Sequence, residues 1–171
     1  MQKIANLFLI GGNGRNIGKT TFACMLIEKL SMKKQVVGVK ISNIKPDDRN
    51  FHGFHEKSLE GEFEIFEESG PGDKDSHRML AAKATRSFFI RTSDSFVEDA
   101  FFSLMKQFDE HSYIVCESNS LRKYTEPKAF IMVGNKEIHD KTGTMENFKI
   151  ADFIVKPMDL EGFGELVKML D

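Results

Sequence analysis

Residues 4–21 read IANLFLIGGNGRNIGKTT, an apolar run that leads through a glycine-rich turn into Gly18-Lys19-Thr20-Thr21. The apolar run predicts a buried strand, and the residues after the turn predict the start of a helix. Glycines allow the backbone to take positive φ and to approach an anion closely, and the N-terminus of a helix carries partial positive charge. This order of parts therefore predicts a cradle for the phosphates of a nucleoside triphosphate.

The spacing inside this loop differs by one residue from the usual G-x-x-x-x-G-K-[ST] pattern. Five residues separate Gly12 from Gly18, and Asn13 stands where the usual spacing has glycine. Asn13 can still make the turn, because asparagine tolerates left-handed backbone better than most residues. The alternative is a strand-to-helix turn that binds nothing. The predicted nucleotide-binding residues are Gly12, Asn13, Gly14, Arg15, Asn16, Ile17, Gly18, Lys19, Thr20 and Thr21.

Two side chains of the loop have expected chemical roles. Lys19 would supply a cation for the β and γ phosphates, and Thr20 a hydroxyl for Mg²⁺. Arg15 could neutralise further charge on the triphosphate, or it could face solvent. The expected ligand is Mg²⁺ with GTP or ATP, and these residues do not choose between the two bases.

The rest of the chain alternates between strand-like and helix-like patterns, which predicts an α/β fold with a mostly parallel sheet and helices on both faces. Residues 43–74 predict a long polar insert or lid of irregular structure, in which residues 62–67 could form a short edge strand. The predicted strands are residues 4–10, 35–41, 87–91, 113–116, 129–133 and 153–155. The predicted helices are a first helix that opens at Gly18 or Lys19 and has its apolar stripe over residues 21–32, then residues 75–84 with Asp75 or Ser76 as N-cap, 96–108 and 160–170.

Composition narrows the class of protein. The 171 residues carry 24 basic and 26 acidic side chains, a net charge of −2, which gives no electrostatic case for nucleic acid or an anionic membrane. No apolar run approaches the ~20 residues of a membrane span, and the N-terminus lacks the features of a signal peptide. Cys24 and Cys116 are expected as core thiols in a reducing compartment. We therefore expect one cytoplasmic domain over residues 1–171.

Acidic residues follow two of the predicted strands, at the edge of the sheet where ligands bind in open α/β folds. Glu117 directly follows an apolar strand, so its carboxylate should face the triphosphate and hold Mg²⁺ or orient water, unless it is simply a solvated strand end. Asp47 and Asp48 follow the second strand and could complete the metal shell, or form a Pro-Asp turn. Lys19 and Glu117 are the candidate catalytic residues. Thr20, Glu117 and Asp47 are the candidate metal ligands.

Two other motifs favour their less specific interpretations. His52 and His55 have a spacing that a metal could use, but no Cys or metalloprotease Glu accompanies them, so a polar loop is favoured. Asn135-Lys136-Glu137-Ile138 follows the fifth predicted strand, where many GTPases carry Asn-Lys-x-Asp. Because Ile138 stands in place of the aspartate, a guanine preference does not follow from this motif.

The chain resembles the molybdopterin-guanine dinucleotide biosynthesis protein B (MobB) family of P-loop GTPases over about residues 3–133. Beyond the phosphate loop, Gly70-Pro71-Gly72-Asp73-Lys74-Asp75-Ser76 is similar to the Pro-Gly-Lys-Asp-Ser segment of that family, with Asp73 inserted. Lys40 and Glu117 also lie where the family has a lysine and a strand-terminal acid. The resemblance implies a Mg²⁺-dependent GTP-binding accessory protein, usually a dimer, that assists guanylylation of the molybdenum cofactor. It also implies that Asp75 lies near the cofactor or metal.

The loop spacing is also similar to that of the dethiobiotin synthetase family. In that family, too, five residues separate the first glycine of the loop from Gly-Lys-Thr. This second likeness is confined to the phosphate loop. It implies the alternative of a small-molecule kinase or ATP-dependent ligase, with residues 42–78 as an acceptor-binding lid. A third interpretation is a degenerate P-loop domain that only mediates protein contacts.

Overall fold

The computed structural model describes residues 1–43, 63–109, 111–134, 142–156, 163–164 and 166–168. Its strands are β1 (Gln2–Gly12), β2 (Val36–Asn43), β3 (Phe63–Glu67), β4 (Arg86–Thr92), β5 (Tyr113–Glu117), β6 (Thr125–Val133) and β7 (Phe153–Val155). Its helices are α1 (Lys19–Leu30), α2 (Asp75–Ala81), α3 (Val97–Met105) and α4 (Thr142–Ile150), with 3₁₀ turns η1 (Asp94–Phe96) and η2 (Leu121–Lys123).

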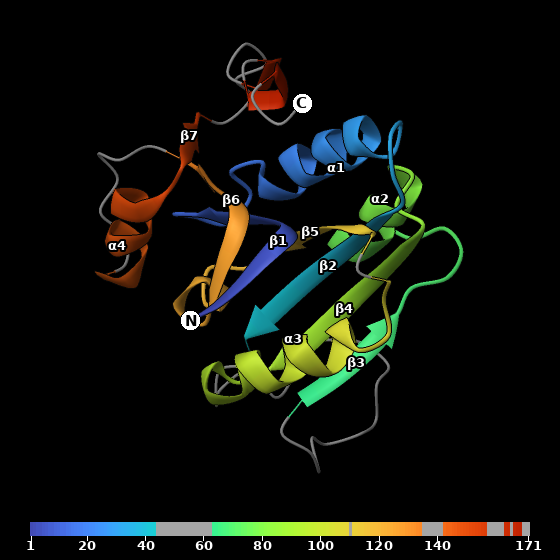
Figure 1. The fold of residues 1–171 in the computed structure, drawn as a ribbon, viewed down its shortest axis with the longest axis horizontal. Helices are drawn as coiled ribbons and strands as arrows, with labels where there is room; N and C mark the ends of the chain where they lie inside the picture. The colour runs from blue at the N-terminus through green and yellow to red at the C-terminus, as the bar shows by residue number, and fades with distance from the viewer. Residues whose placement is uncertain (44–62, 110, 135–141, 157–162, 165, 169–171) are drawn as a thin grey trace.

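The strands form one seven-stranded sheet in the order β3-β4-β2-β5-β1-β6-β7 (Figure 1). Every neighbouring pair is parallel except β3 and β4, which are antiparallel. The predicted α/β class with a mostly parallel sheet is therefore confirmed. Since β1 lies between β5 and β6, the loop that follows β1 begins beside the carboxyl ends of both neighbours.

Helices cover both faces of this sheet, as the alternating side chains of β1 require. Leu7 and Leu9 belong to a core cluster that includes Phe101 of α3, whereas Phe8 and Ile10 belong to a second cluster with residues of α1 and α2. Successive side chains of a strand point to opposite faces, so β1 is apolar on both. Figure 1 shows α1 and α2 on one side of the sheet and α3 on the other.

Several element boundaries differ from the sequence-based expectations. The first helix begins at Lys19, one of its two expected starts, and ends at Leu30, before the predicted residue 32. Helix α3 ends at Met105, although residues 96–108 were predicted to be helical. The fifth predicted strand is longer, because β6 already begins at Thr125. Helix α4 was not predicted at all. Of the predicted C-terminal helix, residues 163–164 and 166–168 are described and are helical.

Helix α2 begins at Asp75, as the predicted helix over residues 75–84 does, but its N-cap and its end were predicted wrongly. Lys74 is its N-cap, with no side-chain hydrogen bond, rather than Asp75 or Ser76. Both candidate caps are engaged elsewhere, since the Asp75 carboxylate pairs with Lys40 and the Ser76 hydroxyl donates to Glu68. The helix ends at Ala81 and the backbone turns left-handed at Lys83, with φ of 73°, so it does not continue to residue 84.

The predicted insert at residues 43–74 is partly regular. Its edge strand is confirmed as β3, which pairs with β4 through residues Phe63 to Glu67. Residues 44–62 lie outside the described part of the chain.

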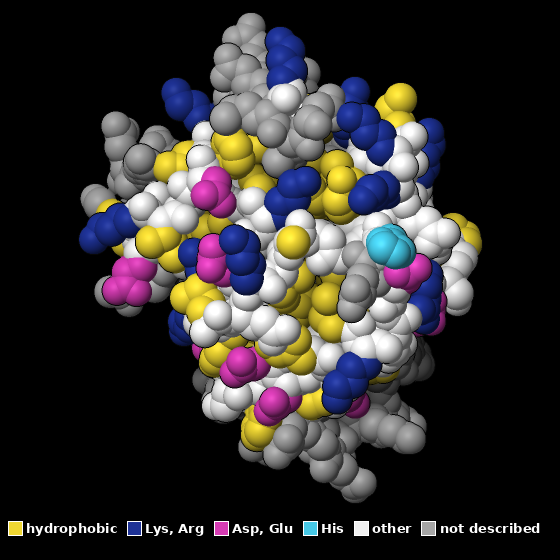
Figure 2. Space-filling view, in the orientation of Figure 1, with side chains coloured by type: hydrophobic (Ala, Val, Ile, Leu, Met, Phe, Trp, Pro, Cys, Tyr) yellow, Lys and Arg dark blue, Asp and Glu magenta, His cyan; other side chains and the backbone are white. Residues whose placement is uncertain are grey.

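Two further observations concern the side chains on the surface and the length of the described helices. On the face shown in Figure 2, acidic and basic side chains are interspersed among apolar ones. Among the helices that the structure describes, none is long and apolar enough to cross a membrane.

Candidate functional site

The loop between β1 and α1 brings two left-handed residues to the start of a helix. Asn16 has φ of 56° and Gly18, the N-cap of α1, has φ of 93°. No side chain caps α1 at Gly18, and a helix N-terminus without a side-chain cap leaves backbone N–H groups available for other acceptors. The first turn of α1 therefore carries the partial positive charge that an anion would contact.

The structure corrects the expected role of Asn13. Positive φ among the described non-glycine residues occurs at Asn16 and Lys83 and not at Asn13, so Asn13 does not make the left-handed turn. Its side chain is instead buried against Gly134 at the end of β6, where an added Cβ would lie 2.0 Å from Asn13 Oδ1. Asn13 thus joins the loop to the segment after β6, and Asn16 supplies the bend.

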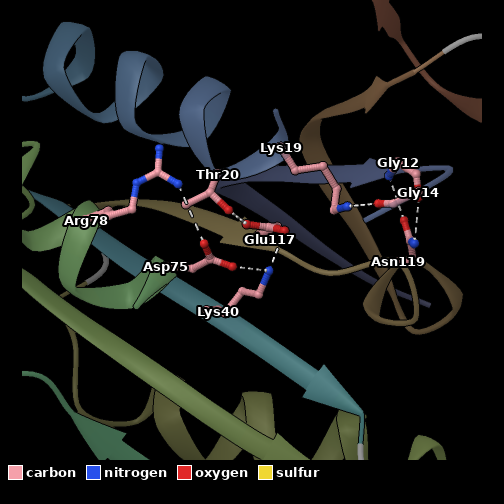
Figure 3. Close-up of polar contacts among 9 residues, drawn as sticks. All are labelled: Gly12, Gly14, Lys19, Thr20, Lys40, Asp75, Arg78, Glu117 and Asn119. Atoms are coloured by element: carbon pink, nitrogen blue, oxygen red, sulfur yellow. Dashed lines mark hydrogen bonds and ion pairs between the residues drawn. The ribbon is translucent and has the colours of Figure 1, made fainter. Parts of the chain in front are cut away.

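Asn119 holds the beginning of the loop. Its Oδ1 accepts a hydrogen bond from the Gly12 backbone N–H at 2.8 Å, and its Nδ2 donates to the Gly12 carbonyl at 2.9 Å (Figure 3). The backbone carbonyl of Asn119 in turn accepts a hydrogen bond from Asn147 of α4 at 3.1 Å. These contacts connect the loop, the residues after β5 and helix α4.

Lys19 folds back over the loop that precedes it. Its Nζ donates to the backbone carbonyl of Gly14, five residues earlier (Figure 3). The aliphatic part of the side chain lies close to Gly12, because a Cβ added there would be 2.9 Å from Lys19 Cδ. The ammonium is therefore held on the loop itself. Arg15, by contrast, is exposed.

Thr20 and Glu117 meet although they lie 97 residues apart in the sequence, and Thr20 Oγ1 donates to Glu117 Oε2 at 2.8 Å. Glu117 is the last residue of β5 and is only 2% exposed, so it is not a solvated strand end. The parallel pairing of β5 with β1 places Glu117 opposite Ile10, two residues before β1 ends at Gly12. The sequence-based placement of Glu117 beside the glycine-rich loop agrees with this geometry.

Lys40 and Asp75 complete a charged cluster around this hydroxyl. Lys40 Nζ lies 2.5 Å from Glu117 Oε1 and 3.0 Å from Asp75 Oδ2 (Figure 3). Burial alone would lower the pKa of Lys40, but the attraction and hydrogen bonds of Glu117 and Asp75 outweigh burial and raise it. Burial would likewise raise the pKa of Asp75, but Lys40 and a hydrogen bond with Thr20 together lower it. Lys40 is therefore an ammonium and Asp75 a carboxylate at neutral pH.

Arg78 adds a second cation on the α2 side of the cluster. Its Nη2 donates to Thr21 Oγ1 at 3.0 Å, and its Nη1 lies 3.8 Å from Asp75 Oδ1. The side chain is 44% exposed, so its charge reaches solvent as well as the cluster. Arg78 therefore links α2 to the first turn of α1.

The side-chain oxygen atoms of the cluster are of the type that binds Mg²⁺, but they are too few to fill its coordination shell. Thr20, Glu117 and Asp75 offer hydroxyl and carboxylate oxygens, the ligands that Mg²⁺ prefers. Within the described ranges, no group of three or more His, Cys, Asp or Glu side chains could hold a metal ion. A metal here would need further ligands, such as water or phosphate oxygens.

Some of the remaining sequence candidates lie in the described part of the chain and others do not. Asp47, Asp48, His52, His55 and the motif at residues 135–138 lie outside the described residues. The two cysteines are described. Burial raises the pKa of Cys24 to about 11 and also raises that of Cys116, so both thiols are protonated and unreactive.

Residue patterns alone did not identify three residues of the site. Lys40 and Asp75 entered only through the family resemblance, and Asn119 was missed altogether. The sequence of β2 could have identified Lys40, because a lysine within an otherwise apolar strand needs a partner for its charge. Asn119 carries no such signal, since a polar residue after a strand is common.

Compared with protein-family models, with curated proteins and with solved structures, the chain matches none. The basis for a function is therefore the site itself.

Proposed function

We propose that the protein is a P-loop type nucleotide-binding protein that takes a nucleoside triphosphate with Mg²⁺ and hydrolyses it slowly. The observation that carries the proposal is the contact between Thr20 Oγ1 and Glu117 Oε2 at 2.8 Å. It joins the hydroxyl that follows a Gly-Lys pair at a helix N-terminus to a buried carboxylate at the end of the adjacent parallel strand. A hydroxyl and a carboxylate in this arrangement suit a Mg²⁺ ion bound to phosphates.

In this proposal the backbone and the side chains of the loop have different roles in phosphate binding. Backbone N–H groups near Gly18 and the first turn of α1 hold phosphate oxygens, and Lys19 leaves the Gly14 carbonyl to pair with the β and γ phosphates. Glu117 orients the attacking water, and Thr20 holds the metal side of the triphosphate. Mg²⁺, when bound, supplies the charge that stabilises the transferring phosphoryl group. No dedicated base is required for slow turnover.

The proposal extends to the base and the client by resemblance alone. We propose GTP as the preferred ligand, with a role as a cytoplasmic, homodimeric accessory protein in guanylylation of the molybdenum cofactor. The support is the similarity of residues 70–76 to the MobB family segment, together with the meeting of Asp75 and Lys40 at the site.

Calorimetric titration of GTP and of ATP, each with Mg²⁺, into wild type and Lys19→Ala tests the proposal. Loss of a charge-assisted contact of roughly 1.5–3 kcal/mol predicts a ~10- to 100-fold weaker affinity in the variant. Lys83→Ala is the matched control, because Lys83 is exposed and lies outside the cluster. Equal, negligible heats in wild type and Lys19→Ala would overturn the proposal.

One observation favours a second candidate function, a small-molecule kinase or ATP-dependent ligase. Lys40 and Arg78 place two cations around Asp75, where an anionic acceptor could bind, and Figure 3 shows Arg78 and Asp75 on the side of Thr20 away from Lys19. Turnover distinguishes the two functions. An enzyme of this class accelerates strongly when small carboxylate or phosphate acceptors are added, whereas an accessory protein stays slow with all of them.

A further inference from the structure

Lys40 occupies the position between the two carboxylates of the site. Its Nζ lies 2.5 Å from Glu117 Oε1 and 3.0 Å from Asp75 Oδ2, so one ammonium bridges both acids. The Lys40 side chain is 19% exposed and that of Glu117 is 3% exposed, which leaves little water to screen the pair. Removing one partner of such a buried pair leaves the other charge uncompensated.

The backbone fixes this arrangement. Lys40 and Glu117 are partners in the parallel register of β2 and β5, two adjacent strands in the middle of the sheet. Asp75 approaches from α2, which packs against β2 where Gly38 leaves room for Met79. The ammonium is therefore placed by the core of the fold and not by a surface loop.

A divalent cation and the Lys40 ammonium would share the same two carboxylates, Glu117 and Asp75. A metal bound to Glu117 or Asp75 would lie within a few ångströms of the ammonium, and like charges at that distance repel strongly where water is excluded. The neighbouring hydroxyl of Thr20 is also hydrogen-bonded to Glu117, so Thr20, Glu117 and Asp75 each already have a partner.

We propose that Lys40 is a resident counter-ion, which a divalent metal displaces from Glu117 and Asp75 when the site loads. The inference rests on the proposed function for the place where the metal binds. The displaced ammonium then pairs with the polyphosphate, whose negative charge favours both the metal and the released lysine. Lys40 thus keeps the metal affinity low until an anionic ligand arrives, and it makes metal and nucleotide binding cooperative.

The test measures Mn²⁺ binding by electron paramagnetic resonance, with no nucleotide present. Lys40→Met is expected to bind Mn²⁺ at least tenfold more tightly than wild type, because the competing ammonium is gone. Lys83→Met, the matched control, should bind like wild type, and Lys40→Met/Glu117→Gln should lose the gain. Mn²⁺ affinity in Lys40→Met equal to or weaker than that of wild type would overturn the proposal.

A measurement on wild type covers the case in which Lys40→Met does not fold. Acetylation of Lys40 by a water-soluble ester is followed by mass spectrometry, with and without the Mn²⁺ concentration that half-saturates the protein. Release from the two carboxylates predicts a several-fold faster modification of Lys40 relative to Lys83. An unchanged ratio contradicts the displacement. Because both tests omit nucleotide, they can succeed even if GTP and ATP fail to bind, and the two proposals fail separately.

Discussion

The side-chain amide of Asn119 pairs with both backbone polar groups of Gly12, at 2.8 and 2.9 Å. The pairing resembles the exchange of hydrogen bonds between neighbouring strands, and it extends the contact of β5 with β1 into the loop. A side chain thus fixes Gly12, the residue at which the glycine-rich loop leaves β1.

Replacement of Asn119 by alanine should destabilise the protein and weaken nucleotide binding. Two lost hydrogen bonds, each worth about 0.5–1.5 kcal/mol, predict a decrease of about 1–3 kcal/mol in the free energy of unfolding, measured with urea. Asn147→Ala removes only the contact to the Asn119 carbonyl and should cost less. If the two variants were equally stable, the pairing with Gly12 would contribute nothing particular.

Thr20→Val tests the hydroxyl that meets Glu117. Valine keeps the shape of threonine but leaves the buried carboxylate without this donor, and hydrogen bonds to charged groups contribute about 1.5–3 kcal/mol. We expect a loss of stability of that order and a loss of the Mg²⁺ dependence of GTP affinity, measured by calorimetry with and without the metal.

The control for the loss of stability in this variant is Thr21→Val. The Thr21 hydroxyl accepts from Arg78, in a contact that is exposed, so its removal should cost little. Retained Mg²⁺ dependence in Thr20→Val would exclude Thr20 as a metal ligand.

Gly38→Ala should shift α2 and the carboxylate that it carries. An added Cβ would lie 2.9 Å from Met79 Cβ and 3.2 Å from Ser87 Oγ, and Met79 is fully buried. Overpacking of this kind costs about 1–3 kcal/mol, which thermal unfolding would detect. Gly164→Ala meets no atom of the described residues within 4 Å and should be nearly neutral. Equal melting temperatures of the two variants would contradict this account of the packing.

Acid should remove the contribution of Asp75 to stability. Its pKa is lowered below the ordinary 3.8 in the folded state, so the stabilisation is present above that pH and is lost as pH falls through the folded value. The difference in melting temperature between wild type and Asp75→Asn should therefore be constant near neutral pH and shrink below about pH 3.8. Asp73→Asn, two residues away and exposed, should show a smaller difference. A difference that grows in acid would reverse the sign of this assignment.

The sequence predicted the parts of the site that depend on local pattern. The apolar run before Gly12, the Gly-Lys-Thr sequence and the acid after an apolar strand each carry their own signal, and the parallel order of strands brings them together. The alternation of residues 62–67 likewise identified the edge strand β3.

Contacts that depend on packing between distant segments could not be predicted in this way. The reach of Asp75 toward Lys40 depends on how α2 packs over Gly38, and the fit of Asn13 against Gly134 depends on the register of β6 with β1. The expected N-cap at Asp75 was wrong for the same reason, because a tertiary ion pair takes the carboxylate away from the helix end. Helix α4 was missed because the apolar residues in its sequence show only weak helical periodicity.

Hydrogen exchange at the backbone amides of the loop tests the central claim most directly, because the phosphates are proposed to bind these N–H groups. With saturating GTP and Mg²⁺, exchange in the peptide that covers residues 12–21 should slow by at least tenfold in wild type and much less in Lys19→Ala. Protection that is absent from this peptide, or that appears only elsewhere in the chain, would contradict the account.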